Sequence, residues 1–522
     1  MSQPAQPPTP SANTSRPERH PRRWGILAVL CLSLVMVTLD NTVLNVAVPS
    51  LVEDLSLSTS QVQWVVDSYS LVFAGLLLIA GSAADRFGRR RGLLTGLAVF
   101  GLGSLIAARS SSVVVLVAAR GVMGVGGALL MPATLAILMH VFEADERPRA
   151  IGIWGGVSAL GVSAGPIVGG VLLDHFGWGS VFLVNVPVVL LALVAALAIV
   201  PESRRQDAPR PDIVGALLSS LGILAIVWST IQVPDHGWLD VRVGLGAALA
   251  GAAGVAFVGW ERRCPQPLIQ VSLLRSGQFL GATTVGGLLL FSLAGTTFLL
   301  TQHLQLTLGF SPLAAGVRVL PVAVAIAVVA PLSPQLSARI GPGRAIAVGL
   351  LLLAGGLATI GLTVQREQYW PVAVGLVGLG AGLGVAMAPA SAALMGSFPR
   401  EHAGVGAAMN DTMQEIGAAL GVAVLGSLAA ASYRHGLPSD VPGAARGSYG
   451  AALSLARHEG AAGSGLAAAA HRAFDLAVEQ SLVVASLVTV VGAVVAVVVL
   501  GRRLAAHHPA DDGRLPSEPV RA

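Results

Sequence analysis

Long apolar runs alternate along the chain with short polar or basic connections. An α-helix needs about 20 mostly apolar residues to cross a bilayer, and a window of that length separates spanning helices from ordinary core helices. The sequence contains fourteen such runs. They lie near residues 24–49, 61–84, 92–108, 113–140, 151–173, 179–200, 212–232, 243–260, 279–303, 313–336, 345–364, 370–396, 403–431 and 480–500. The pattern predicts an all-α polytopic membrane protein with 14 transmembrane helices.

The composition supports a membrane protein over a soluble one. Hydrophobic residues make up 54% of the 522 residues and charged residues only 11%. The net charge of +5 could indicate a nucleic-acid partner, but the arginines sit between the apolar runs. If the N-terminus is cytoplasmic, most of them fall in cytoplasmic connections, as the positive-inside rule expects. An even number of spans then places both termini in the cytoplasm, and we expect no nucleic acid.

The spacing of the runs divides the chain into parts. The apolar run that starts at Trp24 is too long for a cleavable signal peptide, so we predict that it is the first spanning helix. The predicted parts are a disordered cytoplasmic tail (1–23), a six-helix bundle (24–200), a linker with two inserted transmembrane helices (201–278), a second six-helix bundle (279–500) with a long outer loop (432–479), and a cytoplasmic tail (501–522).

A weak internal repeat supports the two bundles. ADRFGRRRGLLTGL at 84–97 aligns with SARIGPGRAIAVGL at 337–350, which matches Gly88 to Gly341 and Gly96 to Gly349. A second echo, at nearly the same offset, relates the stretches that begin at Gly121 and Gly375. Two related six-helix bundles are a transporter architecture in which the substrate path lies between the halves, near the membrane midplane.

Missing residue types exclude several kinds of chemistry. All 32 basic residues are arginine, so the chain has no lysine for a phosphate-binding loop or a Schiff base. Cys31 and Cys264 make no plausible disulfide, and no metal-ligand spacing is apparent. A G-x-S-x-G match centred on Ser163 lies within a predicted membrane helix and not on a strand–turn–helix elbow. We therefore expect no enzyme activity, cofactor or metal, and an energy source other than nucleotide.

The connection after the second run carries the most specific motif. GSAADRFGRRRG, Gly81 to Gly92, resembles the loop signature of the major facilitator superfamily, and the chain resembles its fourteen-helix drug/proton antiporters of the QacA and EmrB type. The resemblance extends from Trp24 to Leu500 and implies the major facilitator fold. It also implies a cytoplasmic gating loop; the alternative is a short basic loop that only sets topology. The gating residues would be Gly81, Asp85, Arg86, Gly88, Arg89 and Arg90.

A second motif, GVSAGPIVGG, resembles the antiporter motif of this family. Its residues are Gly161, Gly165, Pro166, Gly169 and Gly170. Glycines at this spacing let another helix approach closely, and ordinary helix packing is the alternative explanation. Three further stretches resemble family motifs: LDNTVLNVAVP, WVVDSYSLVFAG and VAARGVMGVGGA, which contain Asp40, Asp67 and Arg120 respectively.

Five charged residues stand out within predicted spans, where a charge costs ~2.5–3.5 kcal/mol on insertion scales and so marks a functional candidate. Asp40, Asp67 and Arg120 could share one water-filled vestibule; alternatively, an acid simply pairs with Arg120. Asp411 and Glu415 lie one helical turn apart on one face, so they resist double ionisation and could hold a proton between them. The alternative is that Asp411 lies in a solvated turn at the cytoplasmic mouth.

The resemblance implies a proton-coupled antiporter that exports lipophilic, often cationic drugs or antibiotics across the bacterial cell membrane by alternating access. Its expected partners are the small-molecule substrate, protons and the lipid bilayer, and we expect a monomer. The alternatives are a proton-coupled metabolite or lipid transporter of the same fold and a membrane receptor that transports nothing.

Overall fold

The computed structural model describes residues 21–143, 145–204, 212–398, 403–438, 441–459 and 463–500, and these parts of the chain are helical. Most of the predicted tails, 1–20 and 501–522, lies outside the described residues. The α-helices are α1 (Arg23–Leu55), α2 (Thr59–Phe87), α3 (Arg89–Ala108), α4 (Val113–Val141), α5 (Arg147–His175), α6 (Ser180–Leu183), α7 (Asn185–Ile199), α8 (Ile213–His236), α9 (Val241–Glu261), α10 (Gly277–Gln302), α11 (Pro312–Val329), α12 (Ser333–Ile340), α13 (Pro342–Thr363), α14 (Tyr369–Met395), α15 (Ala403–Gly436), α16 (Tyr449–Glu459) and α17 (Ser464–Val495).

The number of spanning helices agrees with the hydropathy pattern. Within the described residues, 13 helices are long and apolar enough to cross a membrane. The count reaches 14 when the two parts of α2, Thr59–Leu77 and Ile79–Phe87, which meet at a bend of 55°, are taken as one span. The prediction of an all-α polytopic membrane protein is confirmed.

The segment predicted as a long outer loop, 432–479, is largely helical. α15 continues to Gly436, α16 covers Tyr449–Glu459, and α17 begins at Ser464, well before the apolar run that starts near 480. The segment is rich in alanine, which has the highest helix propensity, so helices continue past the point where the hydropathy falls. Hydropathy therefore located the spans but underestimated the helix lengths.

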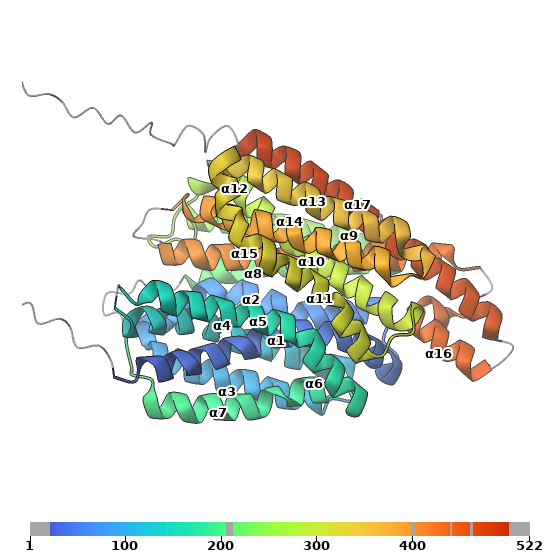
Figure 1. The fold of residues 1–522 in the computed structure, drawn as a ribbon, viewed down its shortest axis with the longest axis horizontal. Coiled ribbons are helices and arrows are strands. Elements are labelled where there is room, and N and C mark those ends of the chain that lie inside the picture. The colour runs from blue at the N-terminus through green and yellow to red at the C-terminus, as the bar shows by residue number, and fades with distance from the viewer. Residues whose placement is uncertain are drawn as a thin grey trace, which may run out of the picture.

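The helices form two bundles with α8 and α9 beside them. α1 to α7 pack together, as do α10 to α17, and α8 contacts both α2 and α15. Figure 1 shows the blue to teal helices of the first bundle on one side and the yellow to red helices of the second on the other. Helix α8 therefore lies against both halves.

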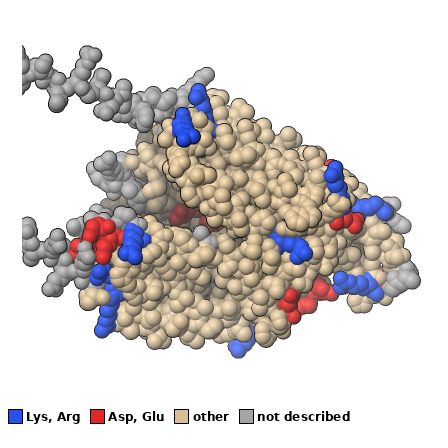
Figure 2. Space-filling model, viewed as in Figure 1, with Lys and Arg blue, Asp and Glu red and all other residues tan. Residues whose placement is uncertain are grey.

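The two ends of the molecule differ. The first described helix begins, and the last one ends, on the left of Figure 1, while α16 lies on the right. We call these the terminus end and the α16 end. Figure 2 shows a hollow between the two bundles toward the terminus end, with acidic atoms inside it.

The backbone carries a trace of the internal repeat. Gly88, between α2 and α3, has a φ of 122°, and Gly341, between α12 and α13, has a φ of 85°. Both values lie in the region that favours glycine. At the next matched pair, a Cβ on Gly96 would meet Leu130 of α4 at 2.9 Å, and one on Gly349 would meet Ala386 of α14 at 2.7 Å. The aligned glycines thus occupy equivalent places in the two bundles.

Candidate functional site

Asp40 and Arg120 form a buried ion pair in the first bundle. Arg120 Nη1 bonds Asp40 Oδ2, and the two side chains are only 1% and 2% exposed. Asn185 of α7 donates from Nδ2 to Asp40 Oδ1 at 2.9 Å. Arg120 also donates from Nε to the Val65 carbonyl at 3.2 Å and lies 4.5 Å from the ring centroid of Tyr69. Both charges are therefore neutralised and hydrogen-bonded, which is the pairing alternative raised for Asp40.

Asp67 is different, although it lies on the helix that also carries Val65. Its side chain is 1% exposed, and among the described residues neither carboxyl oxygen has a hydrogen-bond partner. An ionised carboxylate that is buried without a partner is very costly, because neither water nor a counter-charge stabilises it. The side chain is therefore suited to carry a proton in this conformation.

Asp411 and Glu415 lie one turn apart on α15 and are partly exposed. The Asn410 amide donates to Asp411 Oδ1 at 3.3 Å. The Glu415 carboxyl group accepts a hydrogen bond from Ser70 of α2 and interacts electrostatically with Asp411. The two acids of α15 thus interact with each other, and one of them also contacts α2.

Helix α2 joins the acids of the two bundles. Gln63, Asp67 and Ser70 follow the 3–4 spacing of one helix face. Gln63 Nε2 donates to the carbonyls of Val422 and Ala423 on α15, at 3.1 and 2.9 Å. Since Ser70 also contacts α15, Asp67 lies on the face of α2 that is held against the second bundle.

Tyr69 lies between the buried ion pair and α15. Its phenol interacts electrostatically with Asp40, Arg120 and Glu415, and its hydroxyl is buried without a hydrogen-bond partner among the described residues. Tyr69 therefore interacts with an acid of each bundle, Asp40 in the first and Glu415 in the second. We call Asp40, Asp67, Tyr69, Arg120 and Glu415 the central cluster.

A cavity of about 180 Å³ adjoins this cluster. Its walls include Ala74 and Gly75 of α2 and, on α15, Met409, Met413 and Ile416, which flank the two acids. The lining is mainly apolar, so a lipophilic molecule here would lie within a turn of two carboxyl groups.

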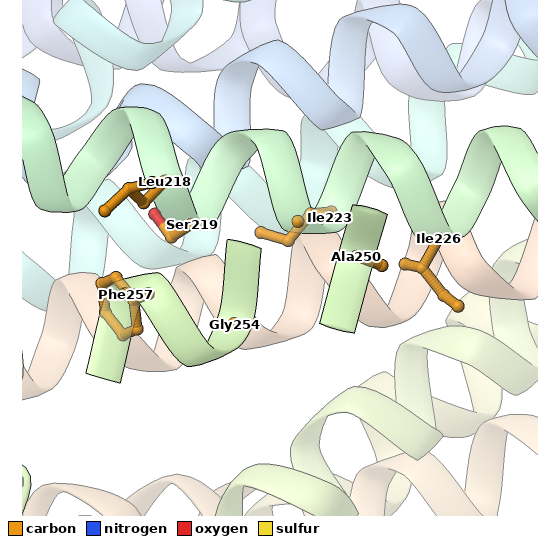
Figure 3. A pocket seen from close by; sticks show the side chains of 8 residues that line it. Leu218, Ser219, Ile223, Ile226, Ala250, Gly254 and Phe257 are labelled. Atoms are coloured by element: carbon orange, nitrogen blue, oxygen red, sulfur yellow. The ribbon is translucent and has the colours of Figure 1, made fainter. Parts of the chain in front are cut away.

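A second, shallower space of about 340 Å³ lies between α8 and α9 (Figure 3). Ser219, Ile223 and Phe257 line both this groove and the first cavity. Figure 3 shows Ser219, Ile223 and Phe257 between the two helices. The inserted helices therefore form part of the wall next to the acids of α15.

The residues of the predicted gating loop make contacts inside the first bundle. Arg89 Nε bonds Asp85 Oδ1 at 2.8 Å, and Arg89 Nη1 donates to the Ala136 carbonyl of α4 at 3.3 Å. Arg90 Nη2 donates to the Leu197 carbonyl of α7 at 2.6 Å. A Cβ on Gly88 would lie 2.8 Å from Glu202 Oε1. These contacts fasten the loop to α4 and to the end of α7.

The other two residues proposed for the gating loop lie on α2. Arg86 is exposed at the end of the helix, and Gly81 faces Pro132 of α4, where an added Cβ would lie 3.4 Å from the proline Cβ.

The glycines of the predicted antiporter motif are sites of close helix contact. On α5, a Cβ on Gly161 or Gly165 would lie 2.1 or 1.8 Å from a threonine hydroxyl of α1, and one on Gly169 would lie 3.1 Å from Val43. The last glycine faces the second bundle, since a Cβ on Gly170 would lie 2.3 Å from Leu313 Cα. A Cβ on Gly316 of α11 would in turn lie 2.2 Å from the Pro166 carbonyl. The motif thus lies against α1 and, at the α16 end, against α11.

Four polar residues of the site were not predicted. Asn185, Ser104, Gln63 and Ser70 lie in apolar runs and carry no charge, so hydropathy and charge do not distinguish them from packing residues. Asn185 also contacts the Ser104 hydroxyl at 3.4 Å. The 3–4 spacing of Gln63, Asp67 and Ser70 was the one available indication.

Comparisons with known proteins show the family of this chain. The profile of the Major Facilitator Superfamily matches residues 30–422. The chain belongs to the major facilitator superfamily. The resemblance inferred from the motifs is confirmed, and the protein is a transporter of this superfamily and not an enzyme.

Several relatives of this transporter are efflux or resistance proteins. The multidrug efflux pump LfrA of Mycolicibacterium smegmatis is 37% identical over 482 residues, which cover 91% of this chain and 95% of that protein. The tetracenomycin C resistance and export protein of Streptomyces glaucescens is 37% identical and covers 78% of this chain and 76% of its own length. The methyl viologen resistance protein SmvA of Salmonella typhimurium is 35% identical, with 83% and 89% covered.

Solved structures agree on the fold. A bacterial homologue of the human lysosomal transporter Spinster, inward-facing and unoccupied, superposes with a TM-score of 0.65 at 17% identity, covering 93% of this transporter and 99% of that chain. A POT family transporter in complex with a thioalcohol-conjugated peptide gives 0.63 at 13% identity, covering 92% and 96%. The major facilitator fold is therefore confirmed.

Proposed function

We propose that this transporter exports lipophilic, often cationic drugs or antibiotics across the bacterial cell membrane in exchange for protons. The relatives that cover most of the chain carry efflux and resistance names, which supports the class of substrate. The main support for proton coupling is the central cluster, where Asp67 is buried without a partner on the face of α2 that contacts α15.

The exchange would work through competition between protons and substrate. With no substrate bound, Asp67 carries a proton, because the ionised form has no partner, and Glu415 and Asp411 share one. A lipophilic cation in the adjacent apolar cavity would place its charge within reach of Glu415 and favour the ionised acid. Substrate binding therefore releases a proton, and proton binding releases substrate.

Movement of one bundle against the other would connect the two sides of the membrane. The α5–α11 contact at Gly170 and Gly316 closes the bundles at the α16 end, and the hollow lies toward the terminus end. We place the terminus end in the cytoplasm, because the arginines of the chain concentrate in the connections at that end. In this assignment the conformation opens inward, as required for taking up a drug from the cell.

The proposal also assigns roles to the remaining residues. The Asp40–Arg120 pair would hold α1 and α4 together and set the electrostatic environment of Tyr69. The gating loop, from Gly81 to Arg90, would stabilise one conformation of the first bundle through its contacts with α4 and α7. The glycines of α5 would allow the halves to close at the α16 end.

A vesicle assay tests the proposed function. Energised inverted vesicles containing the transporter should accumulate ethidium, a fluorescent lipophilic cation, and collapsing the proton gradient should stop the uptake. Asp67→Asn and Glu415→Gln should abolish gradient-driven uptake, while the exposed Asp54→Asn should behave as wild type. Uptake that persists without a proton gradient, or proton co-transport in the same direction as ethidium, would refute antiport.

A further inference from the structure

A cluster of histidine and acidic side chains lies at the α16 end of the second bundle, away from the central cluster. It contains Glu367, His471 and Asp475, whose potential ligand atoms all lie within 4.8 Å of one another. Glu367 follows the 3-10 turn η4 (Val364–Arg366) between α13 and α14, and the other two lie one turn apart on α17. The central cluster uses none of these residues.

The separations fit a metal ion. His471 Nε2 lies 3.1 Å from Glu367 Oε1 and 3.3 Å from Asp475 Oδ2. In a tetrahedral site with bonds of about 2.0 Å, neighbouring ligand atoms are about 3.3 Å apart. Imidazole and carboxylate are ligand types that zinc accepts, and three protein ligands leave one position for water. The arrangement therefore has the atoms of a three-ligand zinc site, the two separations from His471 match its spacing, and the Glu367 and Asp475 oxygens lie within 4.8 Å of each other.

A neighbouring hydroxyl group can hold the histidine in the tautomer that a metal requires. The other ring nitrogen of His471, Nδ1, lies 3.1 Å from the Tyr449 hydroxyl oxygen. The Tyr449 hydroxyl donates to the Leu306 carbonyl at 3.5 Å, so its oxygen can accept a hydrogen bond from Nδ1. The Nε2 lone pair then points toward the two carboxylates. A hydrogen-bond partner on the second ring nitrogen of a histidine ligand is typical of metal sites.

A second histidine, His303, lies next to the buried carboxylate of Asp475. Asp475 is 4% exposed, and its Oδ1 has no hydrogen bond among the described residues. His303, which is 1% exposed, places Nδ1 only 3.3 Å from that oxygen, without the alignment of a hydrogen bond. His303 also begins a π-helical turn, η2 (His303–Thr307), a feature that often occurs at functional sites. A small reorientation of the ring or the carboxylate would let His303 Nδ1 form a hydrogen bond with Asp475 Oδ1 and so orient the carboxylate.

We propose that Glu367, His471 and Asp475 bind one divalent zinc-class cation, with Tyr449 and His303 as positioning residues. The ion would join the connection between α13 and α14 to α17 and, through Tyr449, to α16. The three ligands come from two segments more than a hundred residues apart in the sequence, which is why no local motif marks the site. Without an ion, the competing arrangement is a protonated His471 bonded to both carboxylates.

Zinc titration by calorimetry tests the proposal on the full-length chain in nanodiscs, without a histidine tag and after removal of bound metals. We expect one zinc ion per chain and a higher melting temperature with zinc present. His471→Ala and Asp475→Asn should weaken binding at least tenfold. Glu367→Gln, at an exposed position, gives the same expectation with little risk to folding. Tyr449→Phe should weaken binding by about 10–100-fold, the usual range for a partner behind a ligand.

His458→Ala is the matched control, because His458 is exposed on α16 at the same end and does not belong to the cluster. It should bind zinc as the wild type does. The proposal is overturned if the wild type takes up no zinc, or if Glu367→Gln and His471→Ala bind it as tightly as His458→Ala. Either result would favour the protonated histidine.

Discussion

The contact between α5 and α11 allows a quantitative test of the proposed movement. An ideal Cβ on Gly170 would lie 2.3 Å from Leu313 Cα. Carbon atoms in contact normally stay about 3.5–4.0 Å apart, so Gly170→Ala lacks at least about 1.2 Å of space. The opposing atom belongs to backbone and cannot rotate away. The two helices must therefore separate at the α16 end.

The energetic size of this effect can be estimated. Overpacking an ordered contact costs about 1–3 kcal/mol. A bias of this size changes an equilibrium by about 5–150-fold. If the bundles exchange between two arrangements, and only the present one brings Gly170 against Leu313, the substitution should shift the population toward the arrangement that is open at the α16 end.

Distance measurements between spin labels test this shift. The labels would be placed on exposed positions of the two bundles at the α16 end, by Ser112→Cys and Gln368→Cys, in a Cys31→Ala/Cys264→Ser background. We expect Gly170→Ala to lengthen the label-to-label distance. Gly316→Ala should do the same, because its Cβ would lie 2.2 Å from the Pro166 carbonyl oxygen.

The matched control is Gly156→Ala on the same helix, where an added Cβ meets nothing within 4 Å. Its distance distribution should match that of the parent protein. The reasoning is wrong if Gly170→Ala folds normally and leaves the distribution unchanged, since α5 and α11 would then accommodate the extra atom without separating.

Three further predictions concern the charged residues and the gating loop. Arg120→Gln or Asp40→Asn alone should destabilise the protein by about 3–5 kcal/mol, because each leaves a buried charge without its partner. The double variant should lose less stability than either single variant, and thermal unfolding in detergent would check this. Equal losses of stability in the two single variants and the double variant would contradict the pairing. If protons and cations compete at the acids of α15, raising the pH should tighten ethidium binding to the wild type. Fluorescence titration should show a weaker pH dependence in Glu415→Gln than in Asp411→Asn, because Glu415 belongs to the central cluster and contacts Ser70 of α2. An unchanged pH profile in Glu415→Gln would count against the proposed role of Glu415. Gly88→Ala should lower the melting temperature, because its φ of 122° suits glycine and the new Cβ would crowd Glu202; the control Gly152→Ala has open space around it, and equal melting temperatures would refute the strain.

Much of the fold could be predicted from the sequence, because a bilayer imposes a strong and simple rule. Apolar runs of about 20 residues located the spans, and the repeat located equivalent glycines such as Gly88 and Gly341. The extent of α17 could not be predicted by that rule. Its first turns from Ser464 are outside the apolar run, and alanine-rich segments form helices without being very hydrophobic.

The candidate site was only partly predictable. Charges stand out in apolar runs, so Asp40, Asp67 and Arg120 were recognised as candidates. The sequence does not indicate which of the two acids forms an ion pair with Arg120. The structure pairs Asp40 with Arg120 and leaves Asp67 without a partner. Neutral polar residues such as Asn185 and Ser70 gave little indication, since their importance depends on which helices face each other. For the same reason, the sequence did not indicate the cluster of Glu367, His471 and Asp475, whose members are brought together by tertiary packing.

Proton release on substrate binding tests the central claim most directly. Purified transporter in weakly buffered detergent solution, with a pH indicator present, would be mixed with saturating ethidium at constant temperature. We predict that the wild type releases protons as ethidium binds, that Glu415→Gln releases fewer, and that Asp54→Asn releases as many as the wild type. Ethidium binding with no proton release, or with proton uptake, would contradict competition between substrate and protons at these acids.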